Sequence, residues 1–226
     1  MRVLPRLRIF GLSALACLCA VTANAKEALD TLRAKAEKGE AVAQNELGCI
    51  YETGEGVRVD FDEAAKWYRR AADQGHAMAQ GNLGYLYLIG KGVPLDKAAA
   101  VQWWRKSAAG GCGGSMFNLG LCYKNGDGVE KNLTEAAKWF RVASLAGESS
   151  GMVELGRLHE LGDGVEKDSA QAYAYYKVAS LDYDDRAAKR RLAALLKALS
   201  LSVIAKGDLA AVTLKADIAA DKKPAK

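Results

Sequence analysis

The sequence predicts an all-α fold, a right-handed α/α superhelical solenoid of stacked helix–turn–helix repeats of 36 residues. Three sets of residues that recur at this spacing carry the prediction. They are a Leu-Gly pair (Leu47-Gly48, Leu83-Gly84, Leu119-Gly120, Leu155-Gly156), a pair of loop glycines (Gly54/Gly56, Gly90/Gly92, Gly126/Gly128, Gly162/Gly164) and an aromatic pair (Trp67-Tyr68, Trp103-Trp104, Trp139-Phe140, Tyr175-Tyr176). A hairpin of this size cannot bury its own apolar face, so neighbouring repeats must stack.

The first 25 residues have the three parts of a secretory signal peptide. Arg2, Arg6 and Arg8 give a basic start, residues 9–21 are apolar, and Ala23-Asn24-Ala25 is a small-x-small cleavage site. The apolar run is too short to span a bilayer. We therefore expect an exported protein, periplasmic or secreted, whose mature chain has no membrane span; an uncleaved N-terminal anchor is the alternative.

After the leader, residues 26–39 are expected to form a capping helix, followed by four repeats at 40–75, 76–111, 112–147 and 148–183. Within a repeat, the loop glycine ends the first helix, and an Asp or Asn N-caps the second (Asp60, Asp96, Asn132, Asp168). Residues 184–200 are expected to form a C-terminal capping helix. In 201–226, Gly207-Asp208 is expected to start one more helix to about Ala220, before a disordered basic tail.

The pattern Ala-x-x-x-Leu-Gly-x-x-Tyr, Gly-x-Gly-Val, Asp, Ala-x-x-Trp-Tyr-x-x-Ala-Ala-x-x-Gly resembles the Sel-one-like repeat (SLR), a relative of the tetratricopeptide repeat. The resemblance covers roughly residues 28–198. His159 replaces the repeat Tyr, Tyr183 replaces the closing Gly, and Cys112-Gly113-Gly114 replaces His76-Ala77-Met78. The last change is expected to weaken the start of the first helix in repeat three and to leave a softer joint in mid-array.

The resemblance implies an adaptor whose concave side holds peptides or protein partners. Exported bacterial members are associated with envelope regulation, complex assembly and host interaction. Some disulfide-rich secreted members are linked with β-lactam or peptidoglycan-like ligands, but their paired-cysteine spacing is absent from this sequence.

The net charge argues against a nucleic-acid partner, and the cysteines indicate which disulfide bonds are feasible. Without residues 1–25 the chain carries 29 Lys and Arg against 27 Asp and Glu, with no concentrated basic stripe of the kind that binds nucleic acid. The three remaining cysteines are Cys49, Cys112 and Cys122. Cys112 and Cys122 share one predicted helix and lie too far apart for a disulfide. Cys112, among four glycines, is a candidate for an intermolecular disulfide.

No residue pattern predicts a catalytic, metal or cofactor site. The two histidines, His76 and His159, occupy different positions of different repeats, and no Cys/His set has zinc spacing. Gly162–Asp168 lacks the ligand order of a calcium loop, and no Lys-Ser/Thr follows a glycine pair as in a phosphate loop. The sequence therefore predicts a protein that is not an enzyme and needs no cofactor.

The predicted binding surface is a second stripe along the first helix of each repeat. It reads Asn45-Cys49-Glu52, Gly81-Tyr85-Leu88, Phe117-Leu121-Lys124 and Val153-Arg157-Glu160, with an apolar centre and charged ends. Interfaces are built in this way, with Tyr and Arg as frequent anchors. The candidate partner-binding residues are Tyr85, Leu88, Phe117, Leu121, Lys124, Arg157 and Glu160; the alternative is that some of them, Phe117 and Leu121 above all, only pack between repeats.

The sequence is thus interpreted as an exported scaffold for another protein or peptide in the cell envelope. Two alternatives remain open. One is a binder or weak hydrolase of β-lactam or peptidoglycan-like ligands, which rests on the resemblance alone. The other is a structural envelope protein that associates with itself, for instance through Cys112.

Overall fold

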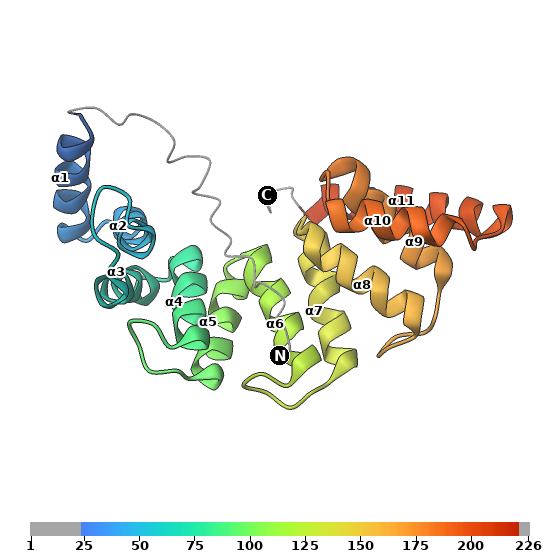
Figure 1. Ribbon diagram of the computed structural model, residues 1–226, viewed down its shortest axis with the longest axis horizontal. Helices are drawn as coiled ribbons and strands as arrows, with labels where there is room; N and C mark the ends of the chain where they lie inside the picture. The colour runs from blue at the N-terminus through green and yellow to red at the C-terminus, as the bar shows by residue number, and fades with distance from the viewer. Residues whose placement is uncertain (1–23, 222–226) are drawn as a thin grey trace. The chain divides into compact units, whose positions relative to one another are not determined.

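The computed structural model describes residues 24–221, which form eleven α-helices and no β-strand (Figure 1). The predicted signal peptide, apart from its last two residues, and the last five residues of the predicted tail lie outside the described residues. The helices are α1 (Asn24–Glu37), α2 (Ala41–Thr53), α3 (Phe61–Asp73), α4 (Ala77–Ile89), α5 (Lys97–Ala109), α6 (Gly113–Asn125), α7 (Leu133–Leu145), α8 (Ser149–Leu161), α9 (Ser169–Asp182), α10 (Arg186–Leu196) and α11 (Leu201–Asp221).

Each repeat is a pair of helices, and local chemistry fixes where they begin and end. The first helix of every pair ends at a glycine in the left-handed conformation, with φ between 65° and 82° (Gly54, Gly90, Gly126, Gly162). The second helix begins after an N-cap whose carboxylate or amide oxygen accepts backbone N–H bonds (Asp60, Asp96, Asn132, Asp168). The sequence prediction of both signals is confirmed.

The predicted weakness at the start of repeat three is not found. Cys112 is the N-cap of α6 and makes no side-chain capping bond, yet α6 spans 13 residues, as α2, α4 and α8 do. The helix starts normally because an N-cap needs extended backbone first, and Cys112 has it at φ −76° and ψ 103°.

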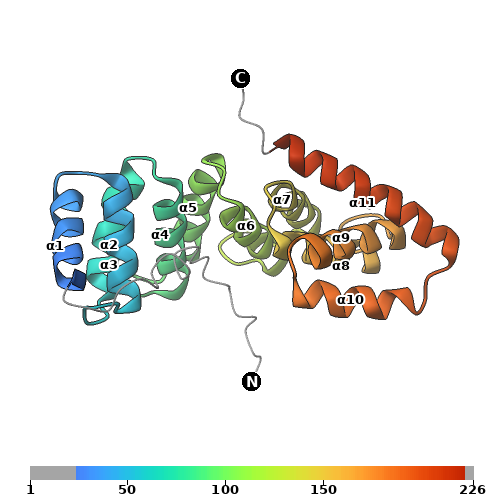
Figure 2. The same cartoon turned by 90° about the horizontal axis from the view of Figure 1, so that it is seen from above.

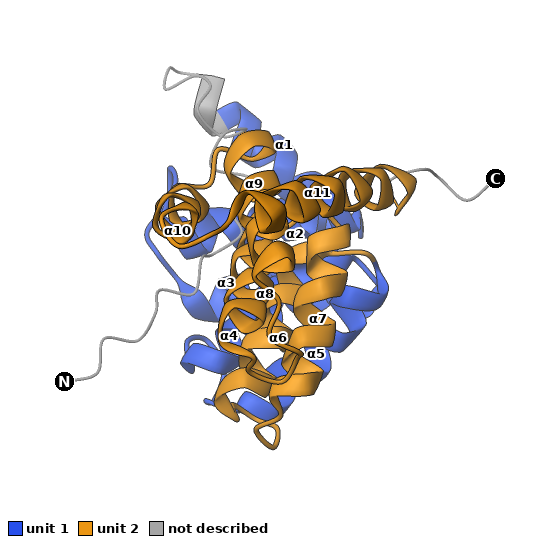
Figure 3. Cartoon of the chain, turned by 90° about the vertical axis from the view of Figure 1, so that its right-hand side faces the viewer, with its two compact units in different colours: residues 1–110 blue, residues 111–226 orange. Residues whose placement is uncertain are grey.

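The helices form two compact units, one ending at Gly110 and the other beginning at Gly111 (Figure 3). In unit 1, α1 to α5 pack each on the next along the chain, as Figure 2 shows. In unit 2, α6 to α10 do the same, but α11 does not continue the series. Instead α11 packs on α9 and also touches α7.

A glycine facing an aromatic ring sets the spacing of the two helices in every repeat. Tyr68, Trp104, Phe140 and Tyr176 are fully buried. A Cβ added at Gly48, Gly84, Gly120 or Gly156 would come within 2.4 to 2.9 Å of the ring in the same repeat. The recurring Leu-Gly pair therefore exists because each ring packs directly on the backbone of the preceding helix.

The C-terminal part corrects one expectation. Gly207 and Asp208 do not start the last helix but lie inside α11, which begins at Leu201. Gly207 is tolerated there because it marks a close helix crossing, where a Cβ would lie 2.4 Å from the Tyr173 ring of α9. Asp208 Oδ1 accepts hydrogen bonds from the Tyr173 hydroxyl at 2.8 Å and from Lys177 Nζ at 2.6 Å. Tertiary contacts with α9 thus override the local helix-breaking signal.

Candidate functional site

We call the predicted surface the helix A stripe, because it follows the first helix (helix A) of each repeat. It has one part on α2 and α4 in unit 1 and another on α6 and α8 in unit 2. In unit 1 Tyr85 and Leu88 are half-buried, so both keep an accessible apolar surface. Asn45 beside them is buried, while Cys49 and Glu52 are half-buried.

The polar residues of unit 1 form one hydrogen-bonded cluster. The Tyr68 hydroxyl of α3 donates to Glu52 Oε2 at 2.6 Å and lies 3.3 Å from Cys49 Sγ. Asn82 Nδ2 of α4 donates to Asn45 Oδ1 at 3.1 Å. These bonds join α2 to α3 and α4, so the cluster fixes this part of the stripe in one arrangement.

Burial changes the acid–base properties of this cluster. Desolvation raises the pKa of Glu52, although the bond from Tyr68 and the charge of Lys91 act in the other direction. Desolvation and the nearby charge of Glu52 raise the pKa of Tyr85. Tyr85 therefore presents a neutral phenol beside a carboxyl group that is easier to protonate than an exposed one.

In unit 2, Phe117 packs between helices and is buried. Its side chain is only 8% exposed, and its ring centroid lies 5.7 Å from that of Phe140. Leu121, one turn further along α6, is half-buried and remains accessible. Phe117 thus supports the helix pair from within, and Leu121 is the apolar residue that α6 offers at the surface.

The cations of the stripe in unit 2 converge on a carboxylate that the sequence analysis did not identify. Glu154 Oε2 of α8 lies 2.6 Å from Lys124 Nζ of α6 and 3.3 Å from Arg157 Nε. The three side chains are between 21% and 27% exposed, so the trio is partly shielded from solvent. Glu154 holds both cations in place and leaves the trio with one net positive charge.

Glu160 is the third charged residue of the stripe in unit 2, and it also has partners. Its Oε2 accepts a hydrogen bond from the Tyr176 hydroxyl at 2.8 Å and lies 3.4 Å from Arg191 Nη1 of α10. Burial, then the bond to Glu160 and its charge, raise the pKa of Tyr176, so the hydroxyl stays a donor at neutral pH.

A signal in the sequence could have revealed the Tyr–Glu pairs. In each repeat, the residue type at the last stripe position correlates with the type of the buried aromatic residue 16 positions later. Tyr occurs with Glu twice, Trp with Leu and Phe with Lys (Glu52/Tyr68, Leu88/Trp104, Lys124/Phe140, Glu160/Tyr176). A carboxylate stands at this position only where a hydroxyl can donate to it, which accounts for the variation along the stripe.

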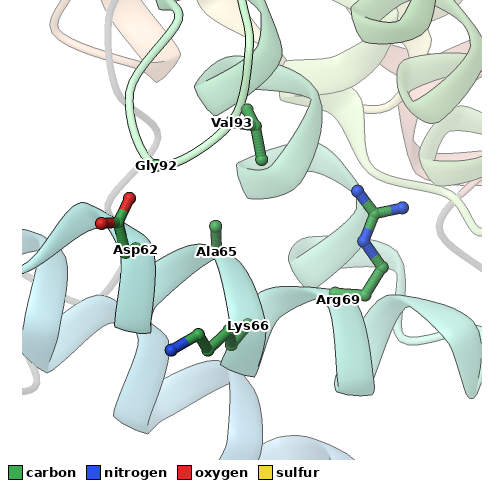
Figure 4. Close-up of a pocket in the computed structure, with 6 residues that line it drawn as sticks. All are labelled: Asp62, Ala65, Lys66, Arg69, Gly92 and Val93. Atoms are coloured by element: carbon green, nitrogen blue, oxygen red, sulfur yellow. The ribbon is translucent and has the colours of Figure 1, made fainter.

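Unit 1 also carries a shallow open pocket of about 400 Å³ at the seam between its two repeats (Figure 4). It is lined by Asp62, Ala65, Lys66, Arg69, Gly92 and Val93. Figure 4 shows Asp62 and Arg69 on either side of Ala65, facing the loop with Gly92 and Val93. The loop lies close to α3, since a Cβ on Gly92 would fall 1.9 Å from the Phe61 carbonyl oxygen.

Arg69 is held at the edge of this pocket by two aromatic residues. Its guanidinium carbon lies 5.5 Å from the Tyr87 ring centroid and 5.4 Å from that of Trp103, and Nη2 donates to the Tyr87 hydroxyl. These contacts join the second helix of repeat one to both helices of repeat two. Arg69 therefore stabilises the seam. The charged lining of the pocket consists of one acidic side chain, Asp62, and two basic ones, Lys66 and Arg69.

The histidines and cysteines lie apart from the stripe, except for Cys49. His76 is the N-cap of α4, where its Nδ1 accepts the Ala79 N–H at 3.2 Å, and desolvation lowers its pKa. His159 stacks on Tyr175 with 5.9 Å between ring centroids. Within the described residues, no disulfide bond involves Cys49, Cys112 or Cys122. Across residues 24–221, no three His, Cys, Asp or Glu side chains gather in a metal-binding arrangement, and no helix combines the length and apolarity needed to cross a bilayer.

The comparisons with known proteins agree with this architecture. A family model described as Sel1 repeat matches residues 41–76, 77–112, 114–148 and 149–182. The crystal structure of a Sel1 repeat protein from Oxalobacter formigenes is 30% identical, with a TM-score of 0.70, over 88% of this chain and 81% of that one. No protein with curated annotation matches.

A second solved structure is that of c5321, a protective antigen of uropathogenic Escherichia coli strains that displays an SLR fold. It is 27% identical, with a TM-score of 0.54, over 88% of this chain and 51% of the antigen, so the present chain spans about half of that protein. The four consecutive family matches and the relative that aligns over most of both chains show that this chain belongs to the Sel1 repeat family.

Proposed function

We propose that this chain is an exported scaffold that binds another protein or peptide through the helix A stripe. Sel1 repeats are generally protein-interaction modules, and the family is typically non-catalytic. The observation that carries the proposal is the accessible apolar surface of Tyr85 and Leu88 in unit 1 and of Leu121 in unit 2. In unit 2 the same helix carries Lys124, which is already fixed by an ion pair. Apolar anchors within a polar rim are the usual composition of a protein interface.

The charged groups favour binding because they are ordered in advance. Immobilising a long, flexible side chain costs about 0.5–1.5 kcal/mol when a partner binds. Glu154 already restrains Lys124 and Arg157, so a partner that contacts these cations loses less side-chain entropy. The net positive charge of the trio favours a partner that brings a carboxylate next to an apolar side chain.

Two double variants test the stripe in each unit separately. Tyr85→Ala with Leu88→Ala removes the apolar surface of unit 1, and Leu121→Ala with Arg157→Ala removes the anchor pair of unit 2. Leu95→Ala is the matched control, since Leu95 is 64% exposed on the loop between α4 and α5, outside the stripe. Partners are identified by crosslinking in cells and mass spectrometry, and their affinities are then measured with purified proteins.

We expect at least one double variant to bind the identified partner at least tenfold more weakly, while the control and the circular dichroism spectra stay unchanged. A partner that binds both folded double variants as tightly as the wild type would contradict the proposal for the stripe. Export is tested independently by cell fractionation and by N-terminal sequencing of the mature chain. A protein that stays in the cytoplasm with residues 1–25 attached would refute the export part.

A further inference from the structure

The solvent-facing side of α11 has a regular apolar stripe that nothing in the described chain covers. The buried side of this helix consists of Gly207, Ala211, Leu214 and Ile218. On the opposite side, Leu209 is 70% and Val212 is 65% exposed, more than almost every other large apolar side chain of residues 24–221. An amphipathic surface helix normally carries polar residues on this side.

The exposed residues follow the spacing of a coiled-coil seam. The α11 stripe consists of Ser202, Ala205, Leu209, Val212, Ala216 and Ala219, all of them exposed, in alternating steps of three and four residues. Such a 3–4 alternation directs one edge of a helix at a second helix. The small alanines at both ends allow two helix backbones to approach closely.

We propose that the α11 stripe pairs with the α11 stripe of a second copy of this chain, with the two helices antiparallel. An antiparallel pair has two-fold symmetry, so the same patch is used on both copies. When Leu209 of one copy lies beside Val212 of the other, Ala205 lies beside Ala216, and the seam closes along about 26 Å of helix at 1.5 Å per residue.

The charges that flank the stripe fit this arrangement. Lys206 and Asp217 lie along one edge of the stripe, and Asp208 and Lys215 lie along the other. In an antiparallel pair each edge meets the same edge of the other copy. Lys206 then faces Asp217 of the second copy, within about two residues or 3 Å along the axis. On the other edge Asp208 is already paired with Lys177 and Lys215 with Asp182 of the same chain. The edge with Lys206 and Asp217 therefore supplies the complementary charges.

The same composition argues against a lipid surface as the occupant. Helices that lie on membranes carry Lys and Arg on the polar face, with Trp, Phe or Leu on the other. The edges of α11 carry charges of both signs, and its stripe has only two large apolar residues, Leu209 and Val212. A single helix seam is smaller than a standard interface of about 800 Å² per partner, so we expect a weak, concentration-dependent association.

Sedimentation of the purified chain in a reducing agent, over a wide concentration range, tests the proposal without a contribution from Cys112 disulfides. Leu209→Glu places a charge in the seam, and Leu95→Glu is the matched control, because the two leucines are 70% and 64% exposed. Lys206→Glu and Asp217→Lys each place like charges opposite one another, and the double variant restores attraction only in the antiparallel arrangement. In a parallel pair Lys206 would face Asp208 instead, so the double variant would not recover.

The expected result is a monomer–dimer equilibrium in which Leu209→Glu and each single charge reversal raise the dissociation constant at least tenfold. The double reversal should return it to within about threefold of the wild type, and Leu95→Glu should leave it unchanged. A wild type that stays monomeric at the highest concentration, or that self-associates unaffected by Leu209→Glu, overturns the proposal. So does binding to anionic vesicles by a monomer that Leu209→Glu abolishes, which would assign the stripe to a membrane.

Discussion

The contact between Gly120 and Phe140 provides a quantitative test of how the repeats are held together. An alanine Cβ at position 120 would lie 2.4 Å from Phe140 Cε1 and 2.5 Å from Cδ1. Two carbon atoms pack best at about 3.5–4.0 Å, so a separation of about 1 Å must be gained. The Phe140 ring is fully buried and cannot move into solvent to provide it.

The expected change in the free energy of unfolding is the cost of overpacking minus the gain in helix propensity. Overpacking a core costs about 1–3 kcal/mol, and the contact with two ring atoms of a fixed side chain belongs to the upper part of that range. Replacing Gly by Ala inside a helix contributes about 1 kcal/mol in the opposite direction. Gly120→Ala should therefore lower the free energy of unfolding by about 1–2 kcal/mol.

Urea denaturation, monitored by circular dichroism, measures the change in the free energy of unfolding. Hydrogen exchange then shows whether the change is located in α6 and α7. Gly113→Ala is the control in the same helix, because its Cβ would lie 3.3 Å from the Ala146 Cβ, and its effect should stay within about 1 kcal/mol. In a Phe140→Leu background, Gly120→Ala should be less destabilising by more than about 0.5 kcal/mol, as expected for residues in contact. A Gly120→Ala variant that is more stable than the wild type would refute the reasoning.

Three further predictions follow from side chains at the site and the seam. Burial raises the folded-state pKa of Glu52 above 4.5, so the folded chain holds the proton more tightly than the unfolded chain, and stability falls as the pH rises through the folded pKa. Glu52→Gln removes this loss of stability. The urea midpoint of the variant should exceed that of the wild type at pH 7 and match it well below pH 4.5. Equal midpoints of the two proteins at both pH values would contradict the prediction. Glu154→Gln should lower stability by about 0.5–1 kcal/mol at low salt and by less at 1 M salt, because the Lys124 and Arg157 ion pairs are screened; a salt-independent loss would exclude an electrostatic origin. Arg69→Lys keeps the charge but loses the planar stacking on Tyr87 and Trp103, so thermal unfolding should show a loss of about 0.5–1 kcal/mol, whereas Arg58→Lys at an exposed loop position should be neutral.

Much of the fold could be predicted because the relevant signals are local and repeated. Asp96 at an N-cap and Gly90 at a helix end act on backbone groups within a few residues, and the chain repeats both signals every 36 residues. Four copies of the same pattern remove the ambiguity that a single copy would leave. The prediction failed at Gly207, where the same local signal occurs inside a helix because a distant tyrosine ring needs the space.

The site could be predicted only in part, because spacing shows which residues share a helix face but not what covers them. Tyr85 and Phe117 belong to the same stripe, yet Phe117 is buried against Phe140 while Tyr85 is half-exposed. Lys124 was a candidate as a charged residue, but its partner Glu154 lies 30 positions away and on another helix. Such pairings depend on how the helices pack.

The sequence by itself thus determined the paired helices of the four repeats and their caps, since local backbone chemistry repeated every 36 residues specifies them. The tertiary structure alone decided which stripe residues reach the surface and which charges are paired. It also decided that α11 turns back onto α9 with an apolar side left open, because those outcomes depend on side chains that only folding brings together.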